Sequence, residues 1–295
     1  MAQDATTPDR RVRTRARARY FVPEPKPWPI IGSAGLFLMA LGAIFVFNGS
    51  NGGWVGIGTG FMMLLYMMLR WFGDVIRESQ GGKYGGWEDL SFRWGMGWFI
   101  FSEVMFFAAF FGALFYIRVL SVPDLATLES NAIMWPGFSS QWPSAGPAFA
   151  EKFSPMSAWG IPALNTLLLL ASGVTVTIAH YALKENHRET LILFLFATVV
   201  LGLLFLMFQV YEYGEAYADL NLKLTTGVYG STFFMLTGFH GFHVTVGAIM
   251  LSVILLRCLS GHFNPDHHFA FEAVAWYWHF VDVVWLGLFI FVYWF

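Results

Sequence analysis

The stretch that decides the fold is VYGSTFFMLTGFHGFHVTVGAIMLSVILL, residues 228–256. It contains no Lys, Arg, Asp or Glu, and it is longer than the roughly 20 apolar residues that a helix needs to cross a bilayer. Because lipid offers the backbone no hydrogen bonds, a helix is the form that such a span takes. Two histidines, His240 and His243, lie near its middle, and an apolar span has to account for them.

The composition of the whole chain extends this conclusion. Of its 295 residues, 57% are hydrophobic and 12% are charged, whereas soluble domains have roughly 25% charged residues. We therefore predict a membrane protein with several spans. The net charge of -2 gives no general argument for nucleic-acid binding, and the single cysteine, Cys258, excludes an internal disulfide and any two-cysteine metal site.

Working outward from residues 228–256, we predict an all-α membrane protein with seven transmembrane helices. The short uncharged turn over residues 48–53 makes the first two helices a hairpin, and the connections over 73–93 and 119–158 are predicted to lie outside the membrane. Glu212 and Glu215, at the end of the fifth span, are expected to be hydrated. The seven spans cover residues 30–48, 54–72, 94–118, 159–183, 189–211, 228–257 and 270–295.

Basic residues predict the orientation. With the N-terminus inside, 14 of the 17 Lys and Arg residues lie on the inner side, and only Arg118, Lys152 and Lys223 lie outside. Phe295 is then outside. Six arginines fall between Arg10 and Arg19, and the bacterial cytoplasmic membrane face is a simpler partner for them than nucleic acid.

Ionisable residues inside the spans are the candidate functional groups. A charged carboxylate near the bilayer centre costs about 2.5–3.5 kcal/mol on insertion scales, so Glu103 must be paired, protonated or turned toward protein. His240 and His243 share one helix face because they are three residues apart, and His279 and Asp282 do the same in the last span. We expect Glu103 to reach His240 or His243.

Three interpretations of these groups remain open from the residues alone. They could converge on a metal or haem, form a proton path or transport site, or make interhelical hydrogen bonds that fix the packing. We favour the packing interpretation. A retinal receptor is excluded because residues 270–295 contain no lysine. The histidine cluster His262, His267 and His268 is interpreted as a solvated turn.

Several motifs together resemble subunit III of the haem-copper cytochrome c oxidases, and the resemblance extends from Trp28 to the C-terminus. The motifs are WPIIG (28–32), DVIRES (74–79), SEVMFF (102–107), PALNTLLLLASGVTVTIAH (162–180), GVYGSTFFMLTGFHGFHVTVG (227–247) and FEAVAWYWHFVDVVWLGLF (271–289).

The resemblance implies a particular architecture. A tail over residues 1–27 precedes a two-helix hairpin over 28–92, and a V-shaped, lipid-binding cleft separates that hairpin from a five-helix bundle over 93–295. The chain would carry no haem or copper, which belong to partner subunits, and it would contact subunit I directly and assemble with subunit II and further oxidase subunits. Its role would be to support proton uptake and the stability of subunit I.

The expected roles of the following residues rest on this resemblance alone. Glu103 matches the family's carbodiimide-reactive glutamate and, with His240, His243, His279 and Asp282, is expected to form a buried polar network. Phospholipid contacts are expected at Arg77, Glu78, Arg257, Trp71 and Lys83. An arginine that some members carry before DVIRES is Gly73 here, and a loop histidine has only Lys83 or Tyr84 as a substitute.

The expected location is the bacterial inner membrane, with a cytoplasmic N-terminus and a periplasmic C-terminus, rather than the mitochondrial inner membrane. Two alternatives from the sequence are a quinol-oxidase subunit III, whose usual form lacks the first two spans, and an independent proton or solute transporter with seven helices.

Overall fold

The computed structural model describes residues 21–127, 133–149 and 152–294, and the regular structure over these residues is helical throughout. Within them, seven helices are long and apolar enough to cross a membrane, which confirms the predicted fold class. The chain divides into two compact units, Met1–Phe92 and Arg93–Phe295. The lipid-binding cleft stays a prediction. Much of the basic tail, over residues 1–20, and Phe295 lie outside the described residues.

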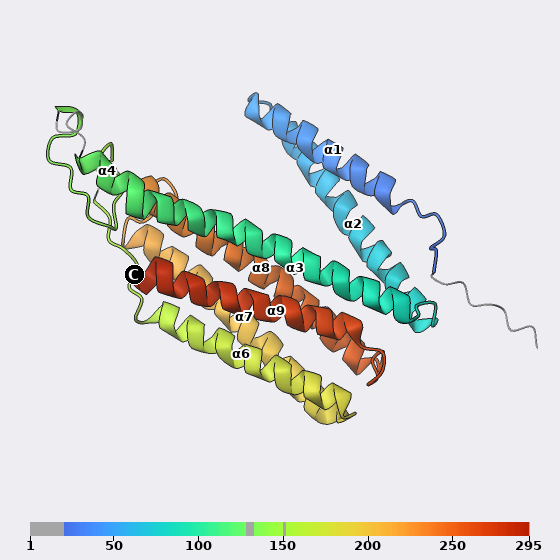
Figure 1. Cartoon of the computed structure of the whole chain (residues 1–295). Coiled ribbons are helices and arrows are strands. Elements are labelled where there is room, and N and C mark those ends of the chain that lie inside the picture. The colour runs from blue at the N-terminus through green and yellow to red at the C-terminus, as the bar shows by residue number, and fades with distance from the viewer. Residues whose placement is uncertain (1–20, 128–132, 150–151, 295) are drawn as a thin grey trace, which may run out of the picture. The chain divides into compact units, whose positions relative to one another are not determined.

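The first unit is built on a hairpin of α1 (Trp28–Phe47) and α2 (Gly53–Gln80) (Figure 1). The two helices pack backbone to backbone, because a Cβ built at Gly42 would lie 2.6 Å from the Gly53 carbonyl oxygen. One built at Gly60 would lie 2.4 Å from the Gly35 carbonyl oxygen. Small residues at such contacts allow the close approach that stabilises helix pairs in lipid.

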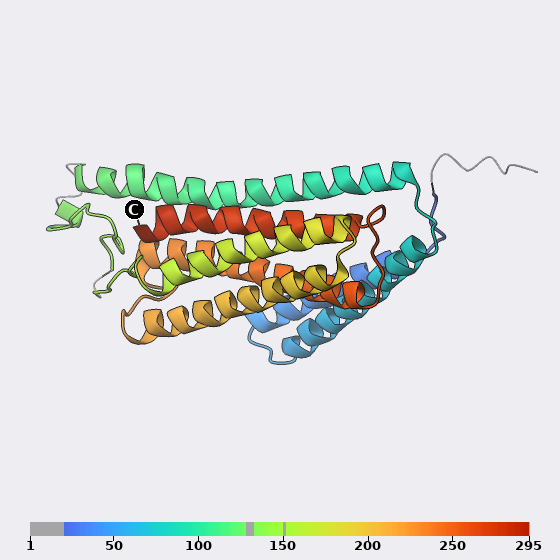
Figure 2. The ribbon, with the colours of Figure 1, turned by 90° about the horizontal axis from the view of Figure 1, so that it is seen from below.

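The second unit is a bundle in which α6, α7, α8 and α9 lie side by side, with α3 along one flank (Figures 1 and 2). The helix α3 begins in the first unit and continues through η1 and α4 without leaving helical geometry. The elements are α3 (Gly86–Phe115), η1 (Tyr116–Ser121), α4 (Val122–Thr127), α6 (Ile161–Lys184), α7 (Arg188–Ala218), α8 (Gly227–Leu259), α9 (Phe269–Leu288) and η2 (Phe289–Trp294).

The centre of the bundle is the indole ring of Trp278 on α9, which is completely buried. Its Nε1–H donates to Ser172 Oγ on α6 at 2.9 Å. A Cβ built at Gly202 on α7 would lie 2.7 Å from the ring, and one built at Gly247 on α8 would lie 2.8 Å from it. One side chain therefore contacts all three neighbouring helices of the bundle.

The predicted connection over residues 73–93 is wrong in extent, because only the turn 81–85 interrupts the helices there. Asp74 and Arg77 are three residues apart on α2 and form an ion pair along its surface, which stabilises helix beyond the apolar stretch. At the start of α3, Glu88 and Asp89 lie near the positive end of the helix dipole. Charged residues in this region extend helices instead of forming a loop.

Replacing Gly247 with Ala is expected to destabilise the second unit by about 1–3 kcal/mol, because the new methyl group overpacks against the buried Trp278 ring. The control is Gly241→Ala on the same helix, where nothing lies within 4 Å of a Cβ and the higher helix propensity of Ala is retained. Thermal unfolding of the purified chain in detergent measures both. Equal stability of the two variants would contradict the packing described here.

Candidate functional sites

The Glu103 carboxylate on α3 contacts His243 on α8, with Oε2 2.9 Å from Nε2. This is one of the two contacts expected from the sequence, and the His240 alternative is not the one formed. The imidazole also has a second partner, since its Nδ1 lies 2.6 Å from the carbonyl oxygen of Phe239. Glu103 is partly buried, with 22% of its side chain exposed, and its Oε1 lies 3.3 Å from Ser102 Oγ.

The hydrogen bond of His243 to the backbone determines the position of one of its protons. A carbonyl oxygen only accepts, so Nδ1 carries a proton and donates it to Phe239. The remaining proton, between Nε2 and Glu103, belongs either to a carboxylic acid beside a neutral imidazole or to an imidazolium beside a carboxylate. Both forms have no net charge, which reduces the cost of placing the pair inside a membrane-spanning region.

Aromatic rings surround this pair. The His243 ring lies 5.0 Å from the Phe107 ring and 6.3 Å from the Phe280 ring, centroid to centroid, and stacks on Tyr277 at 6.4 Å. These rings exclude water on the protein side and offer the carboxyl no competing hydrogen bond. The imidazole is therefore the principal polar partner that the described residues give to Glu103.

His240 has a different environment from its neighbour on α8. It is completely buried, and its Nε2 lies 3.2 Å from the backbone carbonyl oxygen of Val281 on α9, to which it donates. Its ring packs against Phe205 and Trp285, with centroids 5.7 Å and 5.1 Å away. His240 thus ties α8 to the α9 backbone, which fits the packing interpretation of this residue.

His279 and Asp282 form a second carboxyl–imidazole pair, on α9 against α6. His279 Nε2 lies 3.2 Å from Thr177 Oγ1, and because that hydroxyl donates to the Gly173 carbonyl, the histidine is the donor. Its Nδ1 lies 3.6 Å from Asp282 Oδ2. A Cβ at Gly173 would lie 2.4 Å from Asp282 Oδ2, so only glycine leaves room for the carboxyl.

The five predicted network residues therefore lie in three local contacts within the second unit. Over the described ranges, the hydrogen bonds join Glu103 to His243, His240 to the α9 backbone, and His279 to Thr177 beside Asp282. The described residues contain no group of three His, Cys, Asp or Glu side chains that could hold a metal ion. A single continuous network of the five stays a prediction.

Three of the predicted lipid residues, Arg77, Glu78 and Lys83, line a small polar pocket at the end of α2. Arg77 pairs with Asp74 but keeps 65% of its side chain exposed, whereas Glu78 accepts from Lys26 Nζ at 2.6 Å. Three cations face two acids, so the pocket retains positive charge. Its lining residues are Lys26, Asp74, Arg77, Glu78 and Lys83.

Of the two further residues around this pocket, Asp74 was not identified from the sequence, and Tyr84 was named only as a possible substitute for a loop histidine. Asp74 also accepts from the Trp28 indole at 2.8 Å, which ties the start of α1 to the end of α2. Tyr84 donates to Glu78 at 2.8 Å, and burial together with this hydrogen bond raises the pKa of Tyr84, so its hydroxyl stays protonated. The spacing of Asp74 and Glu78, four residues apart on one helix face, was a usable signal for this cluster.

The remaining lipid candidates are not among the residues that line this pocket. Trp71 is on α2 and is 47% exposed, as expected of an aromatic side chain in contact with lipid. Arg257 belongs to the second unit, where its guanidinium lies 4.3 Å from the centroid of the Phe263 ring near the end of α8. Stacking of this kind holds the cation in place while leaving its edge for a phosphate.

In the second unit, one ion pair was not predicted from the sequence, and the environment of one carboxyl group was predicted wrongly. Arg93 on α3 pairs with Glu272 on α9 at 2.5 Å, joining two helices that are far apart in sequence. Glu212 was expected to be hydrated, but it is fully buried and accepts from Tyr293 at 2.6 Å. The helical segment η2 near the C-terminus covers this carboxyl. The position of Glu212 at the end of its span did not indicate this burial.

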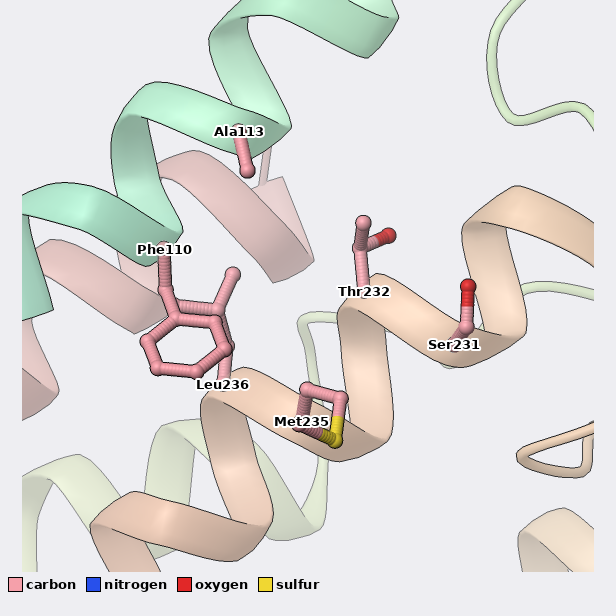
Figure 3. Close-up of a pocket in the computed structure, with 6 residues that line it drawn as sticks. All are labelled: Phe110, Ala113, Ser231, Thr232, Met235 and Leu236. Atoms are coloured by element: carbon pink, nitrogen blue, oxygen red, sulfur yellow. The ribbon is translucent and has the colours of Figure 1, made fainter.

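An apolar notch opens between α3 and α8 (Figure 3). Its two hydroxyl groups are satisfied within α8, since Ser231 and Thr232 both donate to the Val228 carbonyl. The notch therefore offers methyl and ring surface, which suits a hydrocarbon chain better than a polar ligand. Its lining residues are Phe110, Ala113, Ser231, Thr232, Met235 and Leu236.

Comparison with known proteins gives a consistent result. The family model described as "Cytochrome c oxidase subunit III" matches residues 18–295. A protein of Marchantia polymorpha named cytochrome c oxidase subunit 3 is 44% identical over 272 residues, covering 92% of this chain and 94% of the relative. A relative of the same name from Chondrus crispus is 42% identical, and the match covers 94% of this chain and 94% of the relative. One from Hippopotamus amphibius is 41% identical, and the match covers 93% of this chain and 96% of the relative.

Replacing His243 with Leu is expected to leave the Glu103 carboxyl protonated and without its imidazole partner. The carboxyl C=O band in the infrared spectrum should then appear at, or shift to, the higher wavenumber of a weakly bonded acid, and Glu103→Gln should abolish it. Stability should fall by about 1–3 kcal/mol, the cost of leaving a buried polar group unpaired.

Thr245→Val on the same helix is the control, because Thr245 is exposed and donates only to the Gly241 carbonyl of its own helix. An unchanged carboxyl region in His243→Leu would contradict the pairing.

Proposed function

The chain belongs to the cytochrome c oxidase subunit III family, and from that premise we propose that it supports proton uptake and stability of the catalytic subunit I. As a family member it is a multi-pass membrane subunit of an oxidoreductase complex. We further propose direct contact with subunit I, assembly with subunit II, and bound structural phospholipid. Membership makes an independent transporter unnecessary as an explanation of the seven helices.

The Glu103–His243 pair is the observation that carries the proton part of this proposal. It holds one proton between a carboxylate oxygen and an imidazole nitrogen inside the membrane-spanning region. The pair is neutral in either form, so the proton can pass between the carboxyl and the imidazole without leaving an isolated charge in lipid. A role beside the proton entry region of subunit I is consistent with this chemistry.

Redox chemistry is assigned to the partner subunits. Over its described residues, no three His, Cys, Asp or Glu side chains come together as potential ligands of a metal ion. The single cysteine, Cys258, is buried near the end of α8.

Phospholipid is proposed to bind through phosphate in each of the two units. In the first unit, the exposed guanidinium of Arg77 and the ammonium of Lys83 lie at the polar pocket, with Trp71 exposed on the same helix. Glu78, already bonded to Lys26 and Tyr84, would hold the pocket's cations in place. In the second unit, Arg257 presents a guanidinium stacked on Phe263.

The chain is proposed to lie in a bacterial inner membrane with its N-terminus in the cytoplasm. The support is the distribution of Lys and Arg, 14 of 17 of which fall on the side of the N-terminus. In this orientation Arg77, Lys83 and Arg257 share the inner-leaflet side, where anionic lipid headgroups are abundant.

Replacing Arg77 or Arg257 with Ala is expected to lower the phospholipid retained by the purified complex. A charge-assisted hydrogen bond is worth about 1.5–3 kcal/mol, so each loss should reduce occupancy of its site roughly tenfold or more. Lipid extraction and mass spectrometry measure the retained lipid. Arg70→Ala is the control, since Arg70 is exposed on α2 outside the pocket. Equal lipid content in all three variants would refute the assignment.

Removing this chain from the oxidase is expected to leave part of the initial turnover and to shorten the active lifetime of the enzyme. The physical reason is that a subunit without redox groups acts by shaping the proton entry region of its partner and the lipid around it. Oxygen consumption followed over time, with and without the chain, measures both quantities, and adding the purified chain back should restore the lifetime. Immediate loss of all turnover with normal haem spectra would point to a direct catalytic role instead.

A further inference from the structure

The Glu212 carboxyl on α7 is a buried ionisable group that the function proposed above leaves unused. It is completely buried, and its Oε1 accepts a hydrogen bond from the Tyr293 hydroxyl at 2.6 Å. Its Oε2 is also buried and has no hydrogen-bond partner among the described residues. We propose that Glu212 is a proton-binding site, whose carboxylic acid donates its proton to the side-chain carbonyl of Gln209.

The contacts of Glu212 do not suit a carboxylate. A buried carboxylate needs a cation or several hydrogen-bond donors to replace the water that it has lost. The part of the chain that the structure describes gives Glu212 one donor, the neutral hydroxyl of Tyr293. The charged group that acts on it is Glu215, three residues further along α7, which carries a charge of the same sign. A bound proton removes the charge, and the acid then needs one acceptor.

The other titratable groups around Glu212 do not act as counter-ions. They are Tyr213 on α7, Tyr229 on α8 and Tyr293 on η2, and all three are phenols. The cation in this region, Arg118, interacts with Tyr229 and not, among the described groups, with Glu212. The carboxyl therefore lies beside neutral hydroxyl groups and a like charge, and its own proton is what makes it neutral.

Gln209 supplies the acceptor that a protonated Glu212 needs. The two residues are three apart on α7, so their side chains share one helix face. Gln209 is 5% exposed, and both atoms of its amide group are buried without a hydrogen-bond partner among the described residues. An amide oxygen only accepts, so a proton on Glu212 Oε2 satisfies both unpartnered oxygens in one hydrogen bond. A carboxylate in the same place would face this oxygen as a second acceptor, which is unfavourable.

Asn165 on α6 extends the arrangement across the helix interface. The Thr175 and Thr198 hydroxyls, 2.8 Å apart, set the register of α6 against α7. Asn165 lies ten residues before Thr175, and Gln209 lies eleven residues after Thr198. Because the two helices run in opposite directions, the amides come to about the same level of the bundle. Asn165 is completely buried, and its amide atoms also have no partner over the described ranges, so its carbonyl can accept from the Gln209 N–H group.

The bound proton stabilises the packing of η2 on α7. Tyr293 on η2 covers the carboxyl, and its ring packs against Phe233 and Trp285, with centroids 5.4 Å and 5.8 Å away. Loss of the proton creates a charge that has to be hydrated, and opening of η2 is what admits water. The covered state therefore binds the proton more tightly than the open state, so it is stable at low pH and weakens as the pH rises.

The first test is the infrared spectrum of the full chain in lipid nanodiscs at neutral pH. A protonated carboxyl has a C=O band at higher wavenumber than a carboxylate, and Glu212→Gln is expected to remove such a band. The matched control is Glu215→Gln on the same helix, which is partly exposed and should remove carboxylate absorption instead. Gln209→Met should shift the Glu212 band to higher wavenumber because the acid loses its acceptor, whereas Met207→Leu, at an exposed position, should not.

The second test can be made on the unsubstituted chain, so it does not depend on the folding of a variant. Hydrogen–deuterium exchange of the backbone over η2, corrected for the intrinsic effect of pH, measures the opening of this segment. The ratio of open to closed η2 is expected to increase with pH, by up to about tenfold for each pH unit, since one proton is released per opening. Glu212→Gln has no proton to release, so its ratio should not depend on pH.

Three outcomes would overturn the proposal. Glu212→Gln could remove carboxylate absorption and leave the protonated band, which would show that the carboxyl is charged. Gln209→Met could leave the Glu212 band where it is, which would show that another group, such as an ordered water, accepts the proton. Exchange over η2 in the unsubstituted chain could have no pH dependence beyond the intrinsic one, which would show that proton binding and the packing of η2 are independent.

Discussion

The structure of the second unit depends on the indole ring of Trp278. Lipid provides no hydrophobic force between helices, so their association rests on close packing and on hydrogen bonds between them. Trp278 supplies both, because its ring fills the space left by Gly202 and Gly247 while its Nε1–H bonds to Ser172. Ser172 in turn donates to the Leu169 carbonyl at 2.6 Å, so the hydroxyl satisfies a donor and a backbone acceptor together. Glycine is required at both contact positions, since a larger residue would push a neighbouring helix away from α9.

The polar groups of the bundle follow from this fixed position of α9. Once Trp278 sets the rotation of α9, the Val281 carbonyl meets His240 and the Asp282 carboxyl enters the space beside Gly173. Glu103, His240 and His279 then each have a hydrogen-bond partner on another helix. Of the carboxyl groups in the bundle, Glu103 is hydrogen-bonded to an imidazole, Asp282 lies beside one, and Glu212 accepts from a tyrosine hydroxyl. The first unit solves the same packing problem with glycine contacts along α1 and α2 and the Trp28–Asp74 hydrogen bond near their ends.

The sequence predicted the features that depend on composition and spacing. Seven apolar runs became seven helices, and the expected contact of Glu103 with a histidine of span six is present, because a carboxyl in lipid has few ways to be satisfied. The partners that were not predicted are those without a sequence signature. Every residue has a backbone carbonyl, so the sequence does not single out that of Val281 as the partner of His240. Thr177 is one of several hydroxyl-bearing residues on α6. The hydration expected for Glu212 failed because η2, over 70 residues later, folds Tyr293 over it.

The distribution of burial indicates where the proton-bearing pair can act. Of the residues in α3, only Phe107 and Leu114 are buried, whereas α9 is buried along much of its length. Rings such as Phe106 and Phe110, in contact with Phe239, make the interface of α3 with α8 largely aromatic. The Glu103–His243 bond and the Arg93–Glu272 ion pair are directional contacts that fix α3 along its length. Gain or loss of the shared proton therefore changes the bond that positions α3, while the Trp278 core, which involves α6 to α9, is left as it is.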